Sequence, residues 1–205
     1  MIMKVILIRH GQTNENLAHR HQPEHTPLTI QGRKQAIAAA ERLGSVGVTH
    51  VVSSPLVRTL QTASLIADQL DMIPSIDHSL VELIRPLTLT GHTHRSWRSM
   101  FFYLRWYFGL TFSGESYSEL RQRIKLAQTN LDKLPSDATV VVVSHSVFIN
   151  VFLAHMCNGR MMHPFKAART FYNLLHMKNA SMVELTYTPI EKGCGWVRVQ
   201  GELSR

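Results

Sequence analysis

Polar side chains capable of chemistry follow several apolar runs of this chain, at the points where those runs end. The set comprises two arginines, two histidines and a carboxyl group, namely Arg9, His10, Arg58, Glu82 and His145. Arginine matches phosphate oxygens with a planar fork of donors and keeps its charge. A pocket that holds these side chains would therefore suit a tetrahedral dianion and its transfer.

Elimination narrows the chemistry that these residue types allow. Phosphoryl transfer needs charge neutralisation, an in-line nucleophile and a proton for the departing oxygen. A neutral imidazole nitrogen can accept a phosphoryl group, and a carboxylic acid with a raised pKa can protonate the leaving oxygen. The sequence has no H-E-x-x-H pair, acidic cluster or glycine-rich phosphate loop, so we expect no metal and no cofactor. The positive charge must then come from side chains.

Short apolar or extended runs precede these side chains and predict strands of a parallel sheet. The runs are 4–8, 49–54, 75–83 and 140–143. Continuous apolar runs are typical of strands that are buried on both faces. Ligands of such sheets gather at the carboxyl ends of the strands. We therefore expect the five polar side chains to converge on one pocket.

Helices are predicted between and after these strands. They cover 32–43, 55–70, 115–134, 147–156 and 164–175, and two edge strands are expected at 181–188 and 196–199. Strands that alternate with helices predict a three-layer α/β/α sandwich with a mainly parallel central sheet. No linker or repeat divides the chain, so we expect one domain over residues 1–205.

Residues 86–113 interrupt the alternation and predict an inserted cap segment. They are rich in histidine, arginine and aromatic residues. If this segment is helical, Trp97, Phe101, Leu104 and Phe108 share one face. Three interpretations remain open: a cap helix packed on the core, a lid that selects an apolar or aromatic substrate, and a dimer contact or membrane-surface patch.

Charge and cysteine content bound the partners and the compartment. A formal net charge of +8 favours anionic partners without choosing among them. Two cysteines outside any C-x-x-C pair, Cys157 and Cys194, predict no disulfide framework and inert thiols in a reducing compartment. The apolar start ends at Arg9, too early for a signal peptide, and no run approaches the roughly 20 residues that span a bilayer. We expect a cytoplasmic protein without a membrane span.

Motifs spread over residues 4–155 form an ordered pattern. They lie at 7–16 (LIRHGQTNEN), 27–36, 53–63 (SSPLVRTLQTA), 80–83, 114–116 and 143–145. In this order they resemble the motifs of the histidine phosphatase superfamily, which includes the cofactor-dependent phosphoglycerate mutases. A lone Arg-His-Gly is weak evidence, whereas several motifs in the right order are specific.

The resemblance implies a role for each residue of the set. His10 is the nucleophile that becomes phosphorylated. Arg9, Arg58 and His145 bind the transferring phosphoryl group, and Asn16 assists them. Glu82 is the general acid that protonates the leaving group and then the base that activates water. His10 must present an unprotonated nitrogen, so its other nitrogen needs a fixed acceptor such as a backbone carbonyl.

The sequence departs from the family pattern in two places. Residues 83–86 (LIRP) follow Glu82, where many members have a glycine-flanked segment that contains Trp-Glu. Glu115 is therefore an alternative general acid. Ser146 follows His145, where many members have glycine, and adds a hydroxyl close to the phosphate or alters the shape of the pocket.

The hypothesis is a metal-independent phosphomonoesterase that hydrolyses a small phosphorylated metabolite through a phosphohistidine on His10. Phosphoglycerate mutase-type transfer and a phosphoprotein phosphatase are the enzymatic alternatives. A module that binds a phosphate ligand or nucleic acid is the alternative outside enzymes. No nucleic-acid motif accompanies the basic charge, so we expect no nucleic-acid partner. A homodimer is left open.

Overall fold

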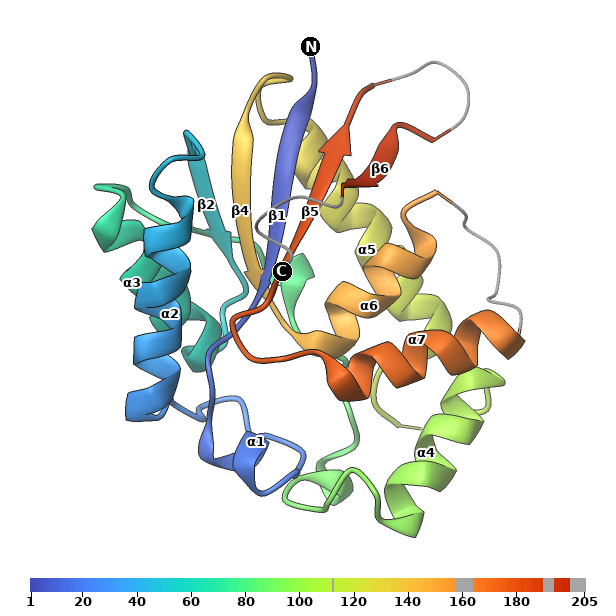
Figure 1. The fold of residues 1–205 in the computed structure, drawn as a ribbon. Coiled ribbons are helices and arrows are strands. Elements are labelled where there is room, and N and C mark those ends of the chain that lie inside the picture. The colour runs from blue at the N-terminus through green and yellow to red at the C-terminus, as the bar shows by residue number, and fades with distance from the viewer. Residues whose placement is uncertain (112, 158–163, 190–193, 200–205) are drawn as a thin grey trace.

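A central sheet of six strands runs through the computed structural model, which describes residues 1–111, 113–157, 164–189 and 194–199. The strands are β1 (Met3–Arg9), β2 (His50–Ser53), β3 (Ser75–Ile76), β4 (Thr139–Ser144), β5 (Met182–Tyr187) and β6 (Trp196–Val199). Their order across the sheet is β3-β2-β4-β1-β5-β6 (Figure 1). The first four pair in parallel, whereas β5 runs antiparallel to β1 and β6 antiparallel to β5.

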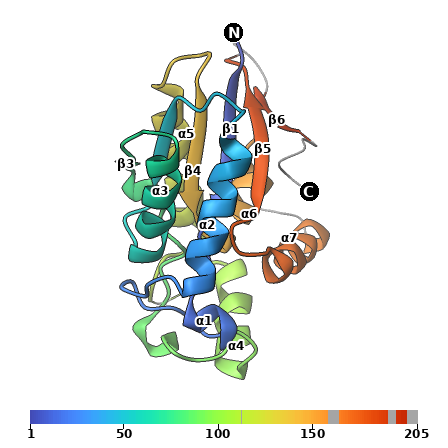
Figure 2. The same cartoon turned by 60° about the vertical axis from the view of Figure 1, so that its left-hand side comes forward.

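Helices cover both faces of the sheet (Figures 1 and 2). One face carries α2 (Ile30–Leu43) and α3 (Val57–Gln69), and the other carries α5 (Tyr117–Asp132) and α6 (Ser146–His155). Successive side chains of β1 serve opposite layers, as the pleat of a strand requires. Ile6 and Ile8 pack into the cluster of α2 and α3, whereas Leu7 packs into the cluster of α5 and α6. The predicted three-layer sandwich with a mainly parallel sheet is confirmed.

The carboxyl ends of β1, β2 and β4 lie together, at the lower end of the view in Figure 1. The same end carries α1 (Asn14–Leu17), α4 (Trp97–Tyr107), α7 (Pro164–His176) and the 3-10 turns η1 (His78–Leu80) and η2 (Leu87–Leu89). Gly11, after β1, meets the backbone of Gly32 so closely that a side chain at either position would overlap its neighbour. This contact fixes the loop after β1 against the first turn of α2.

Two predicted strands differ in the structure. The run 75–83 holds only the two residues of β3, because the carboxylate of Asp77 accepts from the backbone N–H of Ser79 at 2.8 Å and starts η1. The run 181–188 is not an edge strand, because β5 lies between β1 and β6. The sequence of a strand does not show whether another strand will pair with its outer edge, as β6 does with β5.

The insertion 86–113 contains η2 and α4, and α4 is apolar on more than one side. Phe102 and Trp106 are buried in the core cluster of α5 and α6. The face predicted from the spacing is the outer one, because Trp97 is 73% and Leu104 58% exposed. The spacing identified an apolar stripe of this helix but not the stripe that enters the core.

The two cysteines form a disulfide, and the prediction that excluded one was wrong. Cys157 follows α6 and Cys194 precedes β6, and their Cα atoms lie 5.0 Å apart across a sequence separation of 37 residues. The spacing of the two cysteines in the sequence does not indicate this approach, because the folding of the chain brings the end of α6 beside the start of β6.

Of the helices in the described ranges, none has the length and apolar character needed to cross a membrane.

Candidate active site

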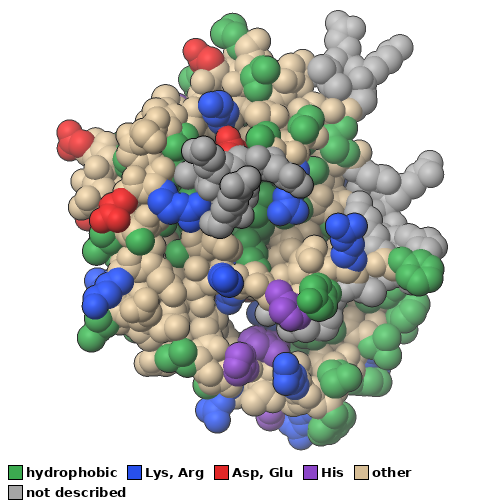
Figure 3. Space-filling model, in the orientation of Figure 1, with side chains coloured by type: hydrophobic (Ala, Val, Ile, Leu, Met, Phe, Trp, Pro, Cys, Tyr) green, Lys and Arg blue, Asp and Glu red, His purple; other side chains and the backbone are tan. Residues whose placement is uncertain are grey.

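A cavity of about 300 Å³ opens where the parallel strands end. Figure 3 shows histidine and Lys or Arg side chains around a hollow in the lower half of this face. Five of the predicted site residues line the cavity, namely Arg9, His10, Asn16, Arg58 and Glu82. Glu82 is the one carboxylate among the described residues that line it, alongside four arginines. The cavity is therefore strongly cationic, with one acid.

His10 follows β1 directly and is held in a fixed orientation. Its side chain is 2% exposed, and its backbone N–H donates to the carbonyl of Ser144 at 3.0 Å. Its Nδ1 lies 2.7 Å from the carbonyl oxygen of Gly11. A carbonyl only accepts, so Nδ1 carries the proton and Nε2 holds the free electron pair.

The electrostatics of the cavity keep this imidazole neutral. Burial lowers the pKa of His10 well below its usual value, and the charges of Arg58 and Arg9 lower it further. A neutral ring with a fixed Nδ1–H presents a nucleophilic Nε2 near neutral pH. This arrangement is the one that phosphoryl transfer to histidine requires.

Arg58, which is buried, and Arg9, which is half-buried, supply positive charge to the cavity. Arg58, in the first turn of α3, is 3% exposed and donates from Nη1 to the carbonyl of Pro23 at 3.0 Å. Burial lowers its pKa to about 10, and Glu82 acts against that shift, so Arg58 stays charged at neutral pH. Arg9 donates to the carbonyl of Met177.

His145 lies behind the wall of the cavity. It is fully buried at the start of α6, with its ring centroid 5.3 Å from that of His10 and its Nε2 2.9 Å from Oγ of Ser54. Burial, Arg58 and His10, in that order, lower the pKa of His145 well below its usual value. A dianion in the cavity would favour its protonated form.

Three buried nitrogens of this group lack a hydrogen-bond partner. Among the described residues, Nε of Arg9, Nε of Arg58 and Nδ1 of His145 are buried without a hydrogen-bond partner. Buried donors are nearly always satisfied in folded proteins. An anion bound between these side chains would supply the missing acceptor oxygens.

Glu82 and Glu115 occupy different environments. Glu82 is half-buried on the cavity wall, and its Oε1 accepts from the backbone N–H groups of Leu83 at 3.0 Å and Phe148 at 3.3 Å. Glu115 lies outside the lining and forms an ion pair with Arg123 at 2.6 Å. Arg123 in turn donates to the carbonyl of Val81 at 2.6 Å. The structure therefore brings Glu82 to the cavity and uses Glu115 to hold the segment before it.

Asn16 combines a capping role with a place in the cavity wall. Its side chain and that of Thr13 form a capping box at α1. Its Oδ1 also accepts from Nδ2 of Asn179 at 2.9 Å, and the same Nδ2 donates to the carbonyl of His10 at 3.2 Å. Asn179 lies just before β5 and joins the end of the chain to the nucleophile. Sequence reasoning missed it, because it stands outside every motif.

Arg85 is half-buried at the cavity, in the segment that departs from the family pattern. Its Nε donates to the hydroxyl of Tyr103 at 2.9 Å, and both residues line the cavity. Burial lowers the pKa of Arg85, but Tyr103 and Glu82 outweigh it and leave the pKa raised. The segment after Glu82, which departs from the family pattern, thus adds a cation to the cavity. That departure was the feature of the sequence that could have indicated this role of Arg85.

His21 lies in the loop after α1 and is 2% exposed. Its Nε2 contacts Oγ of Ser99 at 2.8 Å, and its ring meets that of His94 edge-on at 4.5 Å. Burial lowers the pKa of His21 to about 3 and that of His94 to about 4. These neutral rings attach the loop after α1 to the insertion.

In the described part of the chain, no group of three or more His, Cys, Asp or Glu side chains is placed to hold a metal ion.

The sequence of this chain is similar to a known protein family and to known proteins. The model of the histidine phosphatase superfamily (branch 1) matches residues 5–198. The "Probable phosphoglycerate mutase GpmB" of Yersinia pestis (strain Pestoides F) is 31% identical over 205 residues, which cover 96% of this chain and 91% of that protein.

Solved structures of similar chains cover nearly the whole molecule. A mycobacterial glucosyl-3-phosphoglycerate phosphatase in complex with VO3 is 26% identical with a TM-score of 0.72, over 95% of this chain and 96% of that one. A phosphoserine phosphatase of Entamoeba histolytica in complex with 3-phosphoglyceric acid is 25% identical with a TM-score of 0.75, over 97% and 95%. The relatives thus include phosphatases and a mutase-like protein.

Proposed function

The chain belongs to the histidine phosphatase superfamily, and we propose that it is a metal-independent phosphomonoesterase that hydrolyses a small phosphorylated metabolite through a phosphohistidine on His10. The observation that carries this proposal is the orientation of His10: its Nδ1 donates to the carbonyl of Gly11, which leaves Nε2 as the nucleophile. The unsatisfied Nε atoms of Arg9 and Arg58 support a dianion beside it.

In the first step, Nε2 of His10 attacks the phosphorus in line and the bond from phosphorus to the ester oxygen breaks. Protonated Glu82 gives its proton to that oxygen, so the alcohol leaves neutral. Arg9 and Arg58 stabilise the charge on the equatorial oxygens, since neither loses its proton near neutral pH. His145, once protonated, adds a donor from behind the phosphoryl group.

In the second step, the carboxylate of Glu82 takes a proton from a water molecule, and the oxygen of that water attacks the phosphohistidine. The bond between phosphorus and Nε2 breaks, phosphate leaves and His10 returns to its neutral form. Glu82 is protonated again and ready for the next ester. The same carboxyl group therefore serves as acid and as base, as in other two-step hydrolyses.

A mutase is the second candidate, favoured by the 31% identity to the mutase-like relative. In that reaction the phosphohistidine returns its phosphoryl group to a second hydroxyl rather than to water. Incubation with 3-phosphoglycerate and 2,3-bisphosphoglycerate separates the two: a mutase forms 2-phosphoglycerate, whereas a phosphatase releases inorganic phosphate.

Phenyl phosphate hydrolysis in the presence of a chelator tests the mechanism. We expect full activity with EDTA and a loss of at least about 10³-fold in kcat for His10→Ala, because the covalent route is closed. Acid quenching of the wild type with labelled substrate should trap a phosphoenzyme that the variant lacks. Loss of activity on chelation, or normal turnover by His10→Ala, would contradict the proposal.

We also propose a cytoplasmic location, although the disulfide between Cys157 and Cys194 removes the support that the cysteine content gave to this prediction. Cell fractionation tests it directly. Alkylation of thiols in intact cells, followed by mass measurement, reports whether Cys157 and Cys194 are bridged there. A fully exported protein would contradict the proposed location without touching the proposed chemistry.

A further inference from the structure

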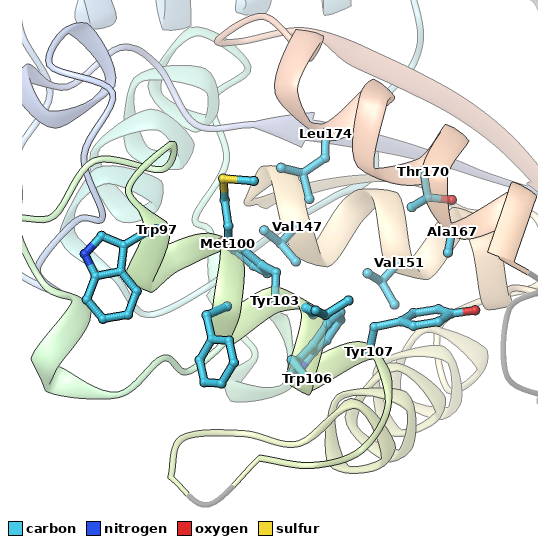
Figure 4. A pocket seen from close by; sticks show the side chains of 12 residues that line it. Trp97, Met100, Tyr103, Trp106, Tyr107, Val147, Val151, Ala167, Thr170 and Leu174 are labelled. Atoms are coloured by element: carbon cyan, nitrogen blue, oxygen red, sulfur yellow. The ribbon is translucent and has the colours of Figure 1, made fainter.

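An apolar groove lies between α4, α6 and α7, beside the cationic cavity. It has a volume of about 650 Å³, within the range of pockets that hold an organic ligand. Figure 4 shows side chains of all three helices directed into it. They include Met100 and Phe101 of α4, Val147 and Val151 of α6, and Ala167 and Leu174 of α7.

The groove adjoins the cavity that holds His10. Tyr103, Val147 and Leu174 line both spaces. Tyr103 is fixed at this boundary, because its hydroxyl accepts from Nε of Arg85 at 2.9 Å. A ligand whose phosphate occupies the cavity would therefore meet the groove with the group attached to that phosphate.

The two spaces differ in charge. The cavity is lined by arginines, including Arg58 and Arg85, whereas none of the described residues that line the groove carries a charge. A hydroxylated or carboxylated leaving group would find few hydrogen-bond partners there, and burying polar groups without partners is unfavourable. An apolar group would instead cover side chains that now face solvent, among them Phe101 and Leu104, which are 53% and 58% exposed.

We propose that the substrate is a monophosphate ester of an apolar alcohol, with its phosphate in the cavity and its hydrocarbon part in the groove. This inference rests on the proposed phosphomonoesterase activity and narrows its substrate class. The groove shares Tyr103, Val147 and Leu174 with the cavity that would hold the phosphate, so we assign the groove to the leaving group of the substrate. A second copy of the chain and a membrane surface are the rival occupants.

A series of n-alkyl monophosphates from ethyl to octyl, kept below their micellar concentrations, measures the use of the groove. We expect kcat/KM to rise roughly two- to fourfold for each added methylene until the groove is filled, because each buried methylene adds hydrophobic binding energy. Hydrolysis of ethyl phosphate with no dependence on chain length overturns this inference alone. Hydrolysis of none of the esters means that the proposed function itself fails.

A variant in α4 and a matched control directly after this helix test whether the dependence on chain length arises from the groove. Phe101 lines it and Phe108 does not, yet the two are 53% and 59% exposed, so their replacement should affect folding to a similar small extent. We expect Phe101→Gln to lower the ratio of kcat/KM for octyl over ethyl phosphate about tenfold, and Phe108→Gln to preserve it. Equal ratios in both variants overturn the proposal.

A third variant fills the groove instead of making it polar. Ala167→Phe should shorten the chain length at which kcat/KM stops rising, an effect that mere loss of stability would not produce. Light scattering and binding to phosphatidylcholine vesicles follow the rival occupants. If Phe101→Gln dissociates a dimer or abolishes vesicle binding while the chain-length dependence persists, the proposal is overturned in favour of that occupant.

Discussion

The position of a single proton determines what His10 can do. The carbonyl of Gly11 holds the proton on Nδ1, and burial of the ring, together with Arg58 and Arg9, lowers the pKa and disfavours a second proton on Nε2. The nucleophile is thus prepared by one backbone acceptor and two neighbouring cations. Sequence motifs identify these residues but do not show how the ring is oriented.

The lowered pKa of His10 predicts that its ring stays neutral as the pH falls. A free imidazole titrates near 6.5, whereas burial, Arg58 and Arg9 place the pKa of His10 well below that value. Nitrogen NMR of the free protein at pH 5.5 should show a neutral ring protonated at Nδ1. Arg58→Gln should raise this pKa, and the exposed Arg198→Gln should not. A protonated His10 in the wild type at pH 5.5 would disprove the electrostatic argument.

Glu82 and Glu115 should give opposite results when each is changed to glutamine. Glu82→Gln removes the proposed acid, so we expect kcat to fall by about 10²- to 10⁴-fold, with a smaller loss for nitrophenyl than for ethyl phosphate. Glu115→Gln breaks its ion pair with the largely buried Arg123, so we expect a loss of roughly 3 kcal/mol in the free energy of unfolding. Urea unfolding and steady-state kinetics on both variants provide the test, and the reverse result would make Glu115 the acid.

At the scale of elements, α4 differs from an ordinary surface helix because it exposes one apolar face and buries another. Phe102 packs on the core, and Trp97, Met100 and Phe101 line the groove. Trp106 does both. An apolar pattern around most of a helix normally indicates full burial. Here it indicates a helix with a packing face and a binding face.

The two tryptophans of α4 both line the groove but differ in burial. Trp106 is 7% exposed and its indole N–H donates to the carbonyl of Glu115 at 3.1 Å, so Trp106→Ala should lower the free energy of unfolding by about 3–5 kcal/mol. Trp97 is 73% exposed, and Trp97→Ala should change it by no more than about 0.5 kcal/mol. Chemical denaturation measures both. Equal losses would mean that α4 packs differently from the structure.

At the scale of the whole molecule, the sequence predicts what local patterns encode and misses what long-range contacts decide. The buried strands and the residues that follow them are visible as apolar runs with polar ends, which is why Arg9, Arg58 and Glu82 were expected in one pocket. Asn179 reaches His10 across 169 residues, and His21 meets Ser99 across 78. Nothing in either local pattern indicates its distant partner. The disulfide between Cys157 and Cys194 was missed for the same reason.

The place of β1 in the sheet has a consequence for how the chain acquires its structure during synthesis. β1 is made first, yet its neighbours are β4 and β5, which come from Thr139–Ser144 and Met182–Tyr187. A ribosome-bound chain that ends before β4 carries its central strand with both edges unpaired, and such edges invite association with other chains. Pairing of β1 must therefore wait until β4 and β5 have been made. Truncation before β4 would leave β1 unpaired on both edges, although residues 5–8 are fully buried in the folded protein. Chaperone demand should therefore stay high until β4 and β5 have been made.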